Sequence, residues 1–205
     1  MRINLFNAGK RFNRDWIFRK ADLTFLPGHT YAITGSNGSG KSTLLQTVAG
    51  SMDISEGKIE WQLNGASVEA DNIYRYLTIA APYVEVIEEM TAAEFLQFHQ
   101  QFKPLLKGIS ITEIIKLVGL EKAATKQIRY YSSGMKQRIK LAQAIFSDTP
   151  LLLLDEPCTN LDVSGFELYQ RLILDYAANK TIIVSSNDVN EFSFCKNVIN
   201  IMDYK

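Results

Sequence analysis

The sequence has little of what marks secreted, membrane-spanning or metal-binding proteins. Among its 205 residues only Cys158 and Cys195 are cysteines, and they form no C-x-x-C pair or Cys/His cluster. We therefore expect two reduced thiols rather than a disulfide or a zinc site. No run reaches the roughly 18 apolar residues of a membrane span, and MRINLFNAGKRF lacks the apolar stretch of a signal peptide. These absences predict a soluble, cytoplasmic protein.

An excess of charge of one sign is also missing. Lysine plus arginine and aspartate plus glutamate number 22 each, so the formal net charge is zero. Nucleic-acid-binding domains usually carry a basic excess, although a local basic patch is compatible with these numbers. We expect no nucleic-acid partner. Hydrophobic residues make up 46% of the chain, which is enough to bury a core without disulfides or metals.

Hydrophobic periodicity divides the chain into three regions. In the first third, KIEWQLNGASV alternates around Asn64-Gly65, which predicts a hairpin. From about Thr91 to Phe146 the period is helical, in TAAEFLQFHQQF, ITEIIKLVGL and SGMKQRIKLAQAIF. The last third has unbroken apolar runs, LLLLD and TIIVSS, which are typical of buried parallel strands. This layout predicts an α/β fold: a parallel-sheet core, an N-terminal antiparallel β part, and a helical subdomain inserted over about residues 88–148.

The segment TYAITGSNGSGKSTLLQTVAG holds the most informative motif. An apolar strand pattern over residues 31–34 leads into G-x-x-x-x-G-K-[ST] and then into a helical pattern, which is the context of a phosphate-binding P-loop. Glycines let backbone N–H groups turn inward around phosphate oxygens, and the helix directs its positive end at the same anion. Lys41 is expected to reach the β- and γ-phosphates, and Ser42 to ligate Mg²⁺. The predicted nucleotide-binding residues here are Gly35, Ser36, Asn37, Gly38, Ser39, Gly40, Lys41, Ser42 and Thr43.

Two acids follow the buried strand pattern of residues 151–154. Asp155 and Glu156 would lie at the carboxyl edge of the sheet, where open α/β folds bind ligands. Asp155 is the predicted second anchor for Mg²⁺, directly or through water. Glu156 is positioned to orient or deprotonate an attacking water. In isolation an ordinary strand-end acid pair would be the preferred interpretation, but beside a phosphate loop the catalytic interpretation is favoured.

Together with residues 131–138, YSSGMKQR, these motifs resemble the ATP-binding subunits of ABC transporters over essentially the whole chain. This segment is similar to the family's signature, usually LSGGQ followed by a basic helix. The resemblance implies that Ser132, Ser133 and Gly134 cap the ATP of a second cassette in a head-to-tail dimer; a hydroxyl, backbone N–H groups and a helix N-terminus suit an anion. It also implies a P-loop NTPase (RecA-like) core, one nucleotide-binding domain over residues 1–205, and ATP and Mg²⁺ as cofactors.

Two further residues take roles from the resemblance. Asp162, in the string Thr-Asn-Leu-Asp, corresponds to the D-loop, which touches the partner's site. Phe12 stands where the family places an aromatic ring that stacks on adenine. Ordinary core packing is an equal alternative for Phe12, and Trp16 is a weaker candidate for the stacking role.

The sequence departs from the family at two switch positions. Asn187 stands where the family usually carries a histidine, and neither His29 nor His99 is near enough in sequence to replace it. We expect both histidines to be ordinary surface or packed residues. Asn187 can donate a hydrogen bond to the γ-phosphate but cannot become a cation, and losing such a donor can lower kcat on the order of 10²–10³. Pro82 replaces the Q-loop glutamine and offers no side-chain donor or acceptor; Glu85 is either a substitute oxygen ligand or a solvated acid.

The signature differs as well. Ser133 replaces a glycine and Met135 a glutamine. If that glycine needs a positive φ, serine is strained there. None of these changes removes the main predicted machinery: the catalytic residues Glu156, Lys41 and Asn187, and the metal ligands Ser42 and Asp155.

The resulting prediction is an ATPase that pairs with a second cassette and drives a separately encoded membrane-spanning transporter subunit, from the inner face of the cell membrane. A slow or non-hydrolysing regulatory cassette is the alternative, because Asn187 and Pro82 weaken the catalytic case. Glu85, Glu88 and Glu89 either meet basic residues of the membrane partner or form a solvated face. The motifs specify neither the transported substance nor whether the two cassettes are identical.

Other P-loop classes fit less well. Translation and DNA-repair members of the family carry two cassettes or long coiled coils, and this chain has neither. A GTPase needs N-K-x-D to read its base, whereas the nearest string here is Asn179-Lys180-Thr181-Ile182.

Overall fold

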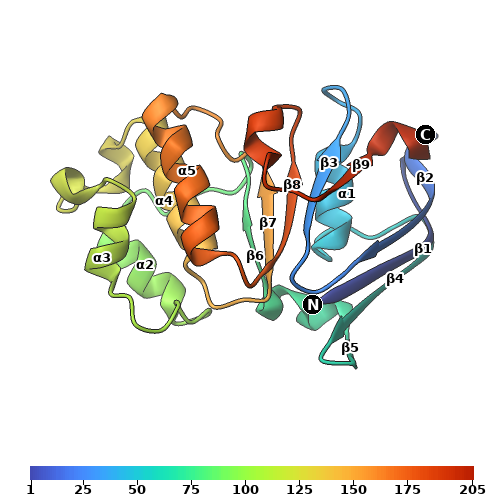
Figure 1. The fold of residues 1–205 in the computed structure, drawn as a ribbon, viewed down its shortest axis with the longest axis horizontal. Coiled ribbons are helices and arrows are strands. Elements are labelled where there is room, and N and C mark those ends of the chain that lie inside the picture. Colours follow the sequence, from blue (N-terminus) through green and yellow to red (C-terminus); the bar gives the residue numbers. More distant parts are fainter. The chain divides into compact units, whose positions relative to one another are not determined.

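The computed structural model describes residues 1–205 and divides into two compact units. Unit 1 consists of Met1–Leu77, Pro150–Glu156 and Asn179–Lys205, and unit 2 of Thr78–Thr149 and Pro157–Ala178. Two sheets and helix α1 belong to unit 1, whereas helices α2 to α5 belong to unit 2 (Figure 1). Strand β6 (Leu77–Ala80) contains the point where the chain passes from one unit to the other.

The parallel sheet of unit 1 is built from the apolar runs. Its strands lie side by side in the order β7 (Leu151–Asp155), β8 (Thr181–Ser185), β3 (Thr30–Thr34) and β9 (Asn197–Asn200) (Figure 1). Every residue of β7 and β8 is buried, as predicted from LLLLD and TIIVSS. The parallel register pairs Asp155 with Ser185, and Ser185 with Ile33. The loops that leave β7, β8 and β3 therefore start at the same edge of the sheet.

The antiparallel sheet of unit 1 contains the predicted hairpin. Its strands are β2 (Asp15–Phe25), β1 (Arg2–Phe12), β4 (Glu56–Leu63) and β5 (Ala66–Val68), in that order. Leu63 pairs with Ala66 across a two-residue turn, and Asn64 and Gly65 have φ angles of 51° and 84°. Two positive φ angles are what a type I′ turn requires, so the Asn-Gly signal is confirmed.

Helix α1 (Lys41–Val48) follows β3 and packs against both sheets of unit 1. Leu44, Leu45 and Val48 are fully buried on it, and each such side chain contributes about 2 kcal/mol by leaving water. The Trp61 indole on β4 donates a hydrogen bond to the Val48 carbonyl at 2.9 Å. This bond joins the antiparallel sheet to the far end of the helix.

Unit 2 contains four α-helices, three of them at the predicted helical patterns. They are α2 (Ala92–Gln100), α3 (Ile111–Leu117), α4 (Ser133–Ile145) and α5 (Val163–Tyr176). The short 3₁₀ helices of the chain are Ala70–Tyr76, Glu121–Ala123, Ile128–Tyr130, Val189–Phe192 and Ile201–Tyr204. Capping boxes begin α2 at Thr91 and α3 at Ser110, which fixes where these helices start. No helix combines the length and apolar composition needed to cross a bilayer.

The predicted fold class is confirmed: an α/β chain with a parallel sheet, an N-terminal antiparallel sheet and a helical region. The boundaries of one domain with an insertion over about 88–148 remain a prediction. The compact unit that holds α2 to α4 also includes α5, which comes after that range.

Candidate functional site

The predicted phosphate loop connects β3 directly to α1. Gly35, Gly38 and Gly40 have φ angles of 143°, 74° and 101°, a region that other residues enter only with strain. Two of them are also sterically required. A Cβ on Gly40 would lie 2.3 Å from Ile17 Cγ2, and one on Gly35 would lie 2.6 Å from Ile201 Cγ2. The loop is therefore a tight backbone cradle that a side chain would fill.

Lys41 lies across this cradle. Its ammonium group donates hydrogen bonds to the carbonyls of Gly35 and Ser36, at 2.9 and 3.2 Å, and the side chain is buried. A cation held inside a ring of backbone groups is suited to bind an anion that enters the ring. The loop also contains a buried hydroxyl without a hydrogen-bond partner, Ser39 Oγ.

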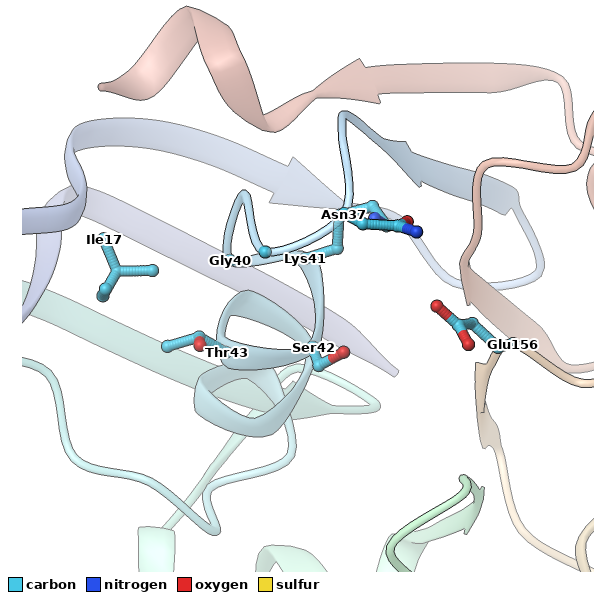
Figure 2. A pocket seen from close by; sticks show the side chains of 8 residues that line it. Ile17, Asn37, Gly40, Lys41, Ser42, Thr43 and Glu156 are labelled. Atoms are coloured by element: carbon cyan, nitrogen blue, oxygen red, sulfur yellow. The ribbon is translucent and has the colours of Figure 1, made fainter.

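A pocket of about 230 Å³ opens at the junction of the loop and α1. It is lined by Ile17, Asn37, Gly38, Gly40, Lys41, Ser42, Thr43 and Glu156. Figure 2 shows the Glu156 carboxylate directed toward the side of α1 on which the Ser42 hydroxyl lies. The structure thus brings the predicted lysine, hydroxyl and carboxylate into one site, although they come from different parts of the chain.

The two acids that follow the apolar run of β7 differ in their surroundings. Asp155 is 2% exposed, and its Oδ1 atom has no hydrogen-bond partner. A buried carboxylate oxygen without a partner is costly unless a ligand satisfies it. Glu156 is exposed and has a φ of 44°, held by a 2.9 Å hydrogen bond from its N–H to the Ser185 carbonyl. A strained backbone that points a carboxylate into a pocket is a mark of functional sites.

Asn187 lies beside the phosphate loop, on the segment that follows β8. Its side-chain nitrogen donates a 2.8 Å hydrogen bond to Asn37 Oδ1, and both side chains are exposed. The amide assignment follows from this bond. The structure therefore brings Asn187 to the same loop as Lys41, as its predicted role requires.

Phe12 lies on the surface of the β1–β2 hairpin, outside the residues that line the pocket. It is 45% exposed, with the Lys10 ammonium 5.1 Å from its ring centre. The core-packing interpretation is therefore wrong. Trp16 packs under the Arg19 guanidinium at 4.4 Å. Stacking of adenine on Phe12 stays a prediction.

Sequence reasoning missed Ile17, the β2 residue that lines the pocket and covers Gly40. No motif marks an isoleucine in a strand for such a role. The close approach of Gly40 to a residue 23 positions earlier is set by packing of β2 on the loop.

The predicted signature residues line a second pocket, within unit 2. Ser132 caps α4 by accepting a hydrogen bond from the Met135 N–H at 3.3 Å, and Ser133 is the first helical residue. Ser133 is absent from the residues with a positive φ, so serine is not strained at this position. A pocket of about 410 Å³ is lined by Ser132, Ser133, Gly134, Met135, Arg138, Asn160, Leu161 and Asp162. The predicted signature and D-loop residues thus lie together.

Asp162 is the N-cap of α5 and lines this pocket. Its Oδ1 accepts hydrogen bonds from the Gly165 N–H at 2.8 Å and from the Ser164 hydroxyl at 2.9 Å. These bonds, with the nearby Arg138 guanidinium, lower the pKa of the Asp162 carboxyl. Gln137 supports the same region: its buried side chain donates to the Pro157 carbonyl at 2.6 Å.

The segment predicted to replace the Q-loop contacts α4 and the 3₁₀ helix Ile128–Tyr130 in unit 2. Lys140 donates to the Pro82 carbonyl at 3.4 Å, Lys136 forms an ion pair with Glu88, and Arg129 lies 3.4 Å from Glu89. Glu88 and Glu89 therefore already have basic partners on their own chain. Of the three acids expected to meet a partner or solvent, Glu85 forms no close ion pair, although its negative charge acts on the Lys140 ammonium.

The residues of unit 1 fit a magnesium nucleotide. The loop leaves room for phosphate oxygens where a Cβ would intrude, Lys41 supplies a cation, and the unpartnered Asp155 oxygen is the hard ligand that Mg²⁺ prefers. Ser42, which lines the pocket, supplies a second oxygen.

Comparisons with known proteins agree with this arrangement. A family model described as "ABC transporter" matches residues 18–159. The uncharacterized ABC transporter ATP-binding protein YybJ of Bacillus subtilis is 29% identical over 187 residues, covering 90% of this chain and 85% of that protein. The cytochrome c biogenesis ATP-binding export protein CcmA of Agrobacterium fabrum is 30% identical over 185 residues, covering 88% and 85%. The dimeric post-hydrolysis structure of the ATP-binding cassette MJ0796, bound to ADP and Pi, has a TM-score of 0.79 at 23% identity, covering 97% and 93%.

Proposed function

The chain belongs to the ABC transporter family, whose model matches residues 18–159, and we propose that it is an ATP-hydrolysing subunit. It binds Mg-ATP in the unit 1 pocket, pairs head-to-tail with a second cassette, and drives a separate membrane-spanning subunit from the inner face of the membrane. One observation carries the proposal: Lys41, Ser42 and Glu156 line the same pocket, and Asp155, which precedes Glu156 in the chain, has a buried Oδ1 atom without a hydrogen-bond partner.

Each residue of the pocket has a separate proposed role in phosphoryl transfer. The loop N–H groups and the Lys41 ammonium hold the β- and γ-phosphates in place. Ser42 and Asp155 hold Mg²⁺, which when bound neutralises charge on the phosphates and polarises the γ-phosphoryl group. Glu156 accepts a proton from, or orients, the water that attacks the γ-phosphorus. Asn187 donates a hydrogen bond toward the γ-phosphate from its position beside the loop.

In the proposed dimer, the signature pocket of unit 2 contacts the ATP that is bound by the other cassette. The N-terminus of α4 presents unpaired N–H groups to an anion, and the exposed Ser133 side chain lies beside them. We assign this pocket to the ATP of the partner cassette. The MJ0796 cassette, which has a similar fold, is dimeric in its structure with ADP and Pi, and we propose the same pairing for this chain.

A cassette that binds but does not hydrolyse ATP is the second candidate, and Asn187 and Pro82 are the residues that favour it. The test is Mg-ATP turnover by the purified chain, by Glu156→Gln, and by the control Glu69→Gln, which changes an exposed glutamate of unit 1 outside the pocket. Dimerisation is followed in the same samples by sedimentation velocity.

We expect Glu156→Gln to lower turnover on the order of a hundredfold or more and to accumulate ATP-bound dimers, with Glu69→Gln unchanged. ATP binding by the wild type without turnover above that of Glu156→Gln would reject hydrolysis by the isolated chain. Wild-type protein that binds no ATP would reject the proposal altogether.

A further inference from the structure

The outer side of the phosphate loop is held by a lysine that belongs to none of the motifs above. Lys205 follows the 3₁₀ helix η5 (Ile201–Tyr204), which continues from β9. Its ammonium group donates hydrogen bonds to the Ser39 carbonyl at 2.6 Å and to the Ile17 carbonyl at 2.8 Å. One residue of the loop and one residue of the pocket wall thus share a single cation.

The bond to Ser39 acts on the loop through one peptide group. In a trans peptide the C=O of one residue and the N–H of the next point in opposite directions. With the Lys205 ammonium on the Ser39 carbonyl, the Gly40 N–H is directed away from Lys205. A cation on the carbonyl also polarises the peptide, which strengthens the hydrogen bond that the N–H can donate. Lys205 therefore sets both the orientation and the donor strength of the Gly40 N–H.

The same turn of chain holds the other end of the loop. Ile201 is fully buried, and its Cγ2 would lie only 2.6 Å from a Cβ on Gly35. Four residues later, Lys205 holds Ser39, so this C-terminal segment contacts the loop at its first glycine and again just before its last. Asn200 fixes the start of η5 by accepting a 3.1 Å hydrogen bond from the Met202 N–H.

The second bond of Lys205 places the pocket wall. The Ile17 carbonyl accepts this bond, and the Ile17 side chain covers Gly40 within the pocket. The spacing between β2 and the loop is therefore fixed by the same cation. The charge adds to that of Lys41 at a site that suits an anion, although Lys205 lies on the exposed side of the loop.

We propose that Lys205 is a positioning residue for nucleotide binding: it holds the phosphate loop against β2 in the phosphate-receiving conformation before the nucleotide arrives. This inference rests on the proposed function of the unit 1 pocket. Lys205 is not expected to touch the reacting atoms.

The test compares Lys205→Met, which removes the charge and the donors, with Lys205→Arg, which keeps both. Lys196→Met is the matched control, because its loss changes the net charge equally and Lys196 lies outside the pocket. The dissociation constant for ADP is measured by calorimetry, so that turnover plays no part. Hydrogen exchange is measured on the nucleotide-free protein, for the peptide over residues 35–43 and for peptides over β7 and β8. Circular dichroism fixes a temperature at which each variant is folded.

We expect Lys205→Met to raise the ADP dissociation constant roughly threefold to tenfold, with Lys205→Arg and Lys196→Met within about twofold of the wild type. Exchange in Lys205→Met should rise in residues 35–43 and stay unchanged in β7 and β8. A uniform rise across these peptides would mean a general loss of stability and would overturn the inference.

Equal ADP binding by the wild type and Lys205→Met would overturn the inference and leave the proposed function standing. If the wild type binds neither ADP nor ATP, the proposed function itself fails and the role of Lys205 falls with it.

Discussion

Asn187 is the replaced switch residue that contacts the phosphate loop. Its amide nitrogen donates to Asn37 of the phosphate loop, and the proposal is that this bond is exchanged for one to the γ-phosphate when ATP is bound. A bond that strengthens as charge develops on the γ-phosphate acts mainly in the transition state, so its loss should affect turnover more than binding.

We predict that Asn187→Ala lowers kcat on the order of a hundredfold and changes the dissociation constant for ATP less than about threefold. Steady-state hydrolysis and equilibrium binding measure the two effects separately. Asn72→Ala, at an exposed asparagine outside the pocket, is the control. An unchanged kcat would show that Asn187 takes no part in the chemical step.

At the scale of elements, a hydrogen-bonded network of His99, Gln143 and Ser147 connects α2 with α4 and the residues that follow it. His99 Nε2 lies 2.7 Å from Ser147 Oγ, which donates to the Gln143 carbonyl at 2.6 Å; the Gln143 amide nitrogen lies 3.0 Å from His99 Nδ1. Because the hydroxyl donates to Gln143, Nε2 carries the proton and Nδ1 accepts. The expectation of a packed histidine is confirmed for His99, which is 8% exposed.

Burial, and to a smaller extent the charge of Lys103, lowers the pKa of His99 from 6.5 to about 4. The unfolded chain therefore binds the proton first as the pH falls, and the stability that neutral His99 contributes is complete above pH 6.5 and is lost between pH 6.5 and about 4. The loss is at most about 3.4 kcal/mol. Urea unfolding at pH 7 and pH 5 should show a steeper loss for the wild type than for His99→Gln. The control His29→Gln, at an exposed histidine, should lose as much stability as the wild type. An equal loss of unfolding free energy between pH 7 and pH 5 in all three proteins would show that His99 is not the cause of the pH dependence.

For the whole molecule, the proposal requires that the signature pocket act on the ATP of another chain. Ser133 is exposed at the first position of α4. An acid there favours the helix through its dipole, yet it repels a phosphate placed at the same end. Replacing Ser133 by an acid should therefore weaken anion binding without weakening the helix.

We predict that Ser133→Glu, introduced into Glu156→Gln, abolishes the ATP-dependent dimer and leaves ATP binding by the monomer within about threefold. Ser133→Gln, of similar size but uncharged, should retain the dimer. Sedimentation velocity with and without ATP distinguishes these results. A persistent dimer in the glutamate variant would contradict a head-to-tail arrangement.

Local signals in the sequence were sufficient for much of the fold. Residues that are close in the sequence determine the Asn64-Gly65 turn, strand β7 and the helices that follow Thr91 and Ser110. Their φ preferences, hydrophobic period and capping side chains can therefore be identified from short segments. The phosphate loop belongs to this group, because its glycines and Lys41 are close neighbours in the sequence. The acids at the end of β7 were placed correctly for the same reason: a strand end positions the residue that follows it.

Tertiary structure alone decided the remaining parts of the site. Ile17 lines the pocket because β2 packs on Gly40, Asn187 reaches Asn37 across 150 positions, and Lys205 binds Ser39 across 166. No periodicity or spacing encodes contacts between distant segments, since they depend on how closely strands and loops approach after packing. Ser133 is the converse case: serine would be strained there only at a positive φ, and it is an ordinary helical residue because α4 begins there.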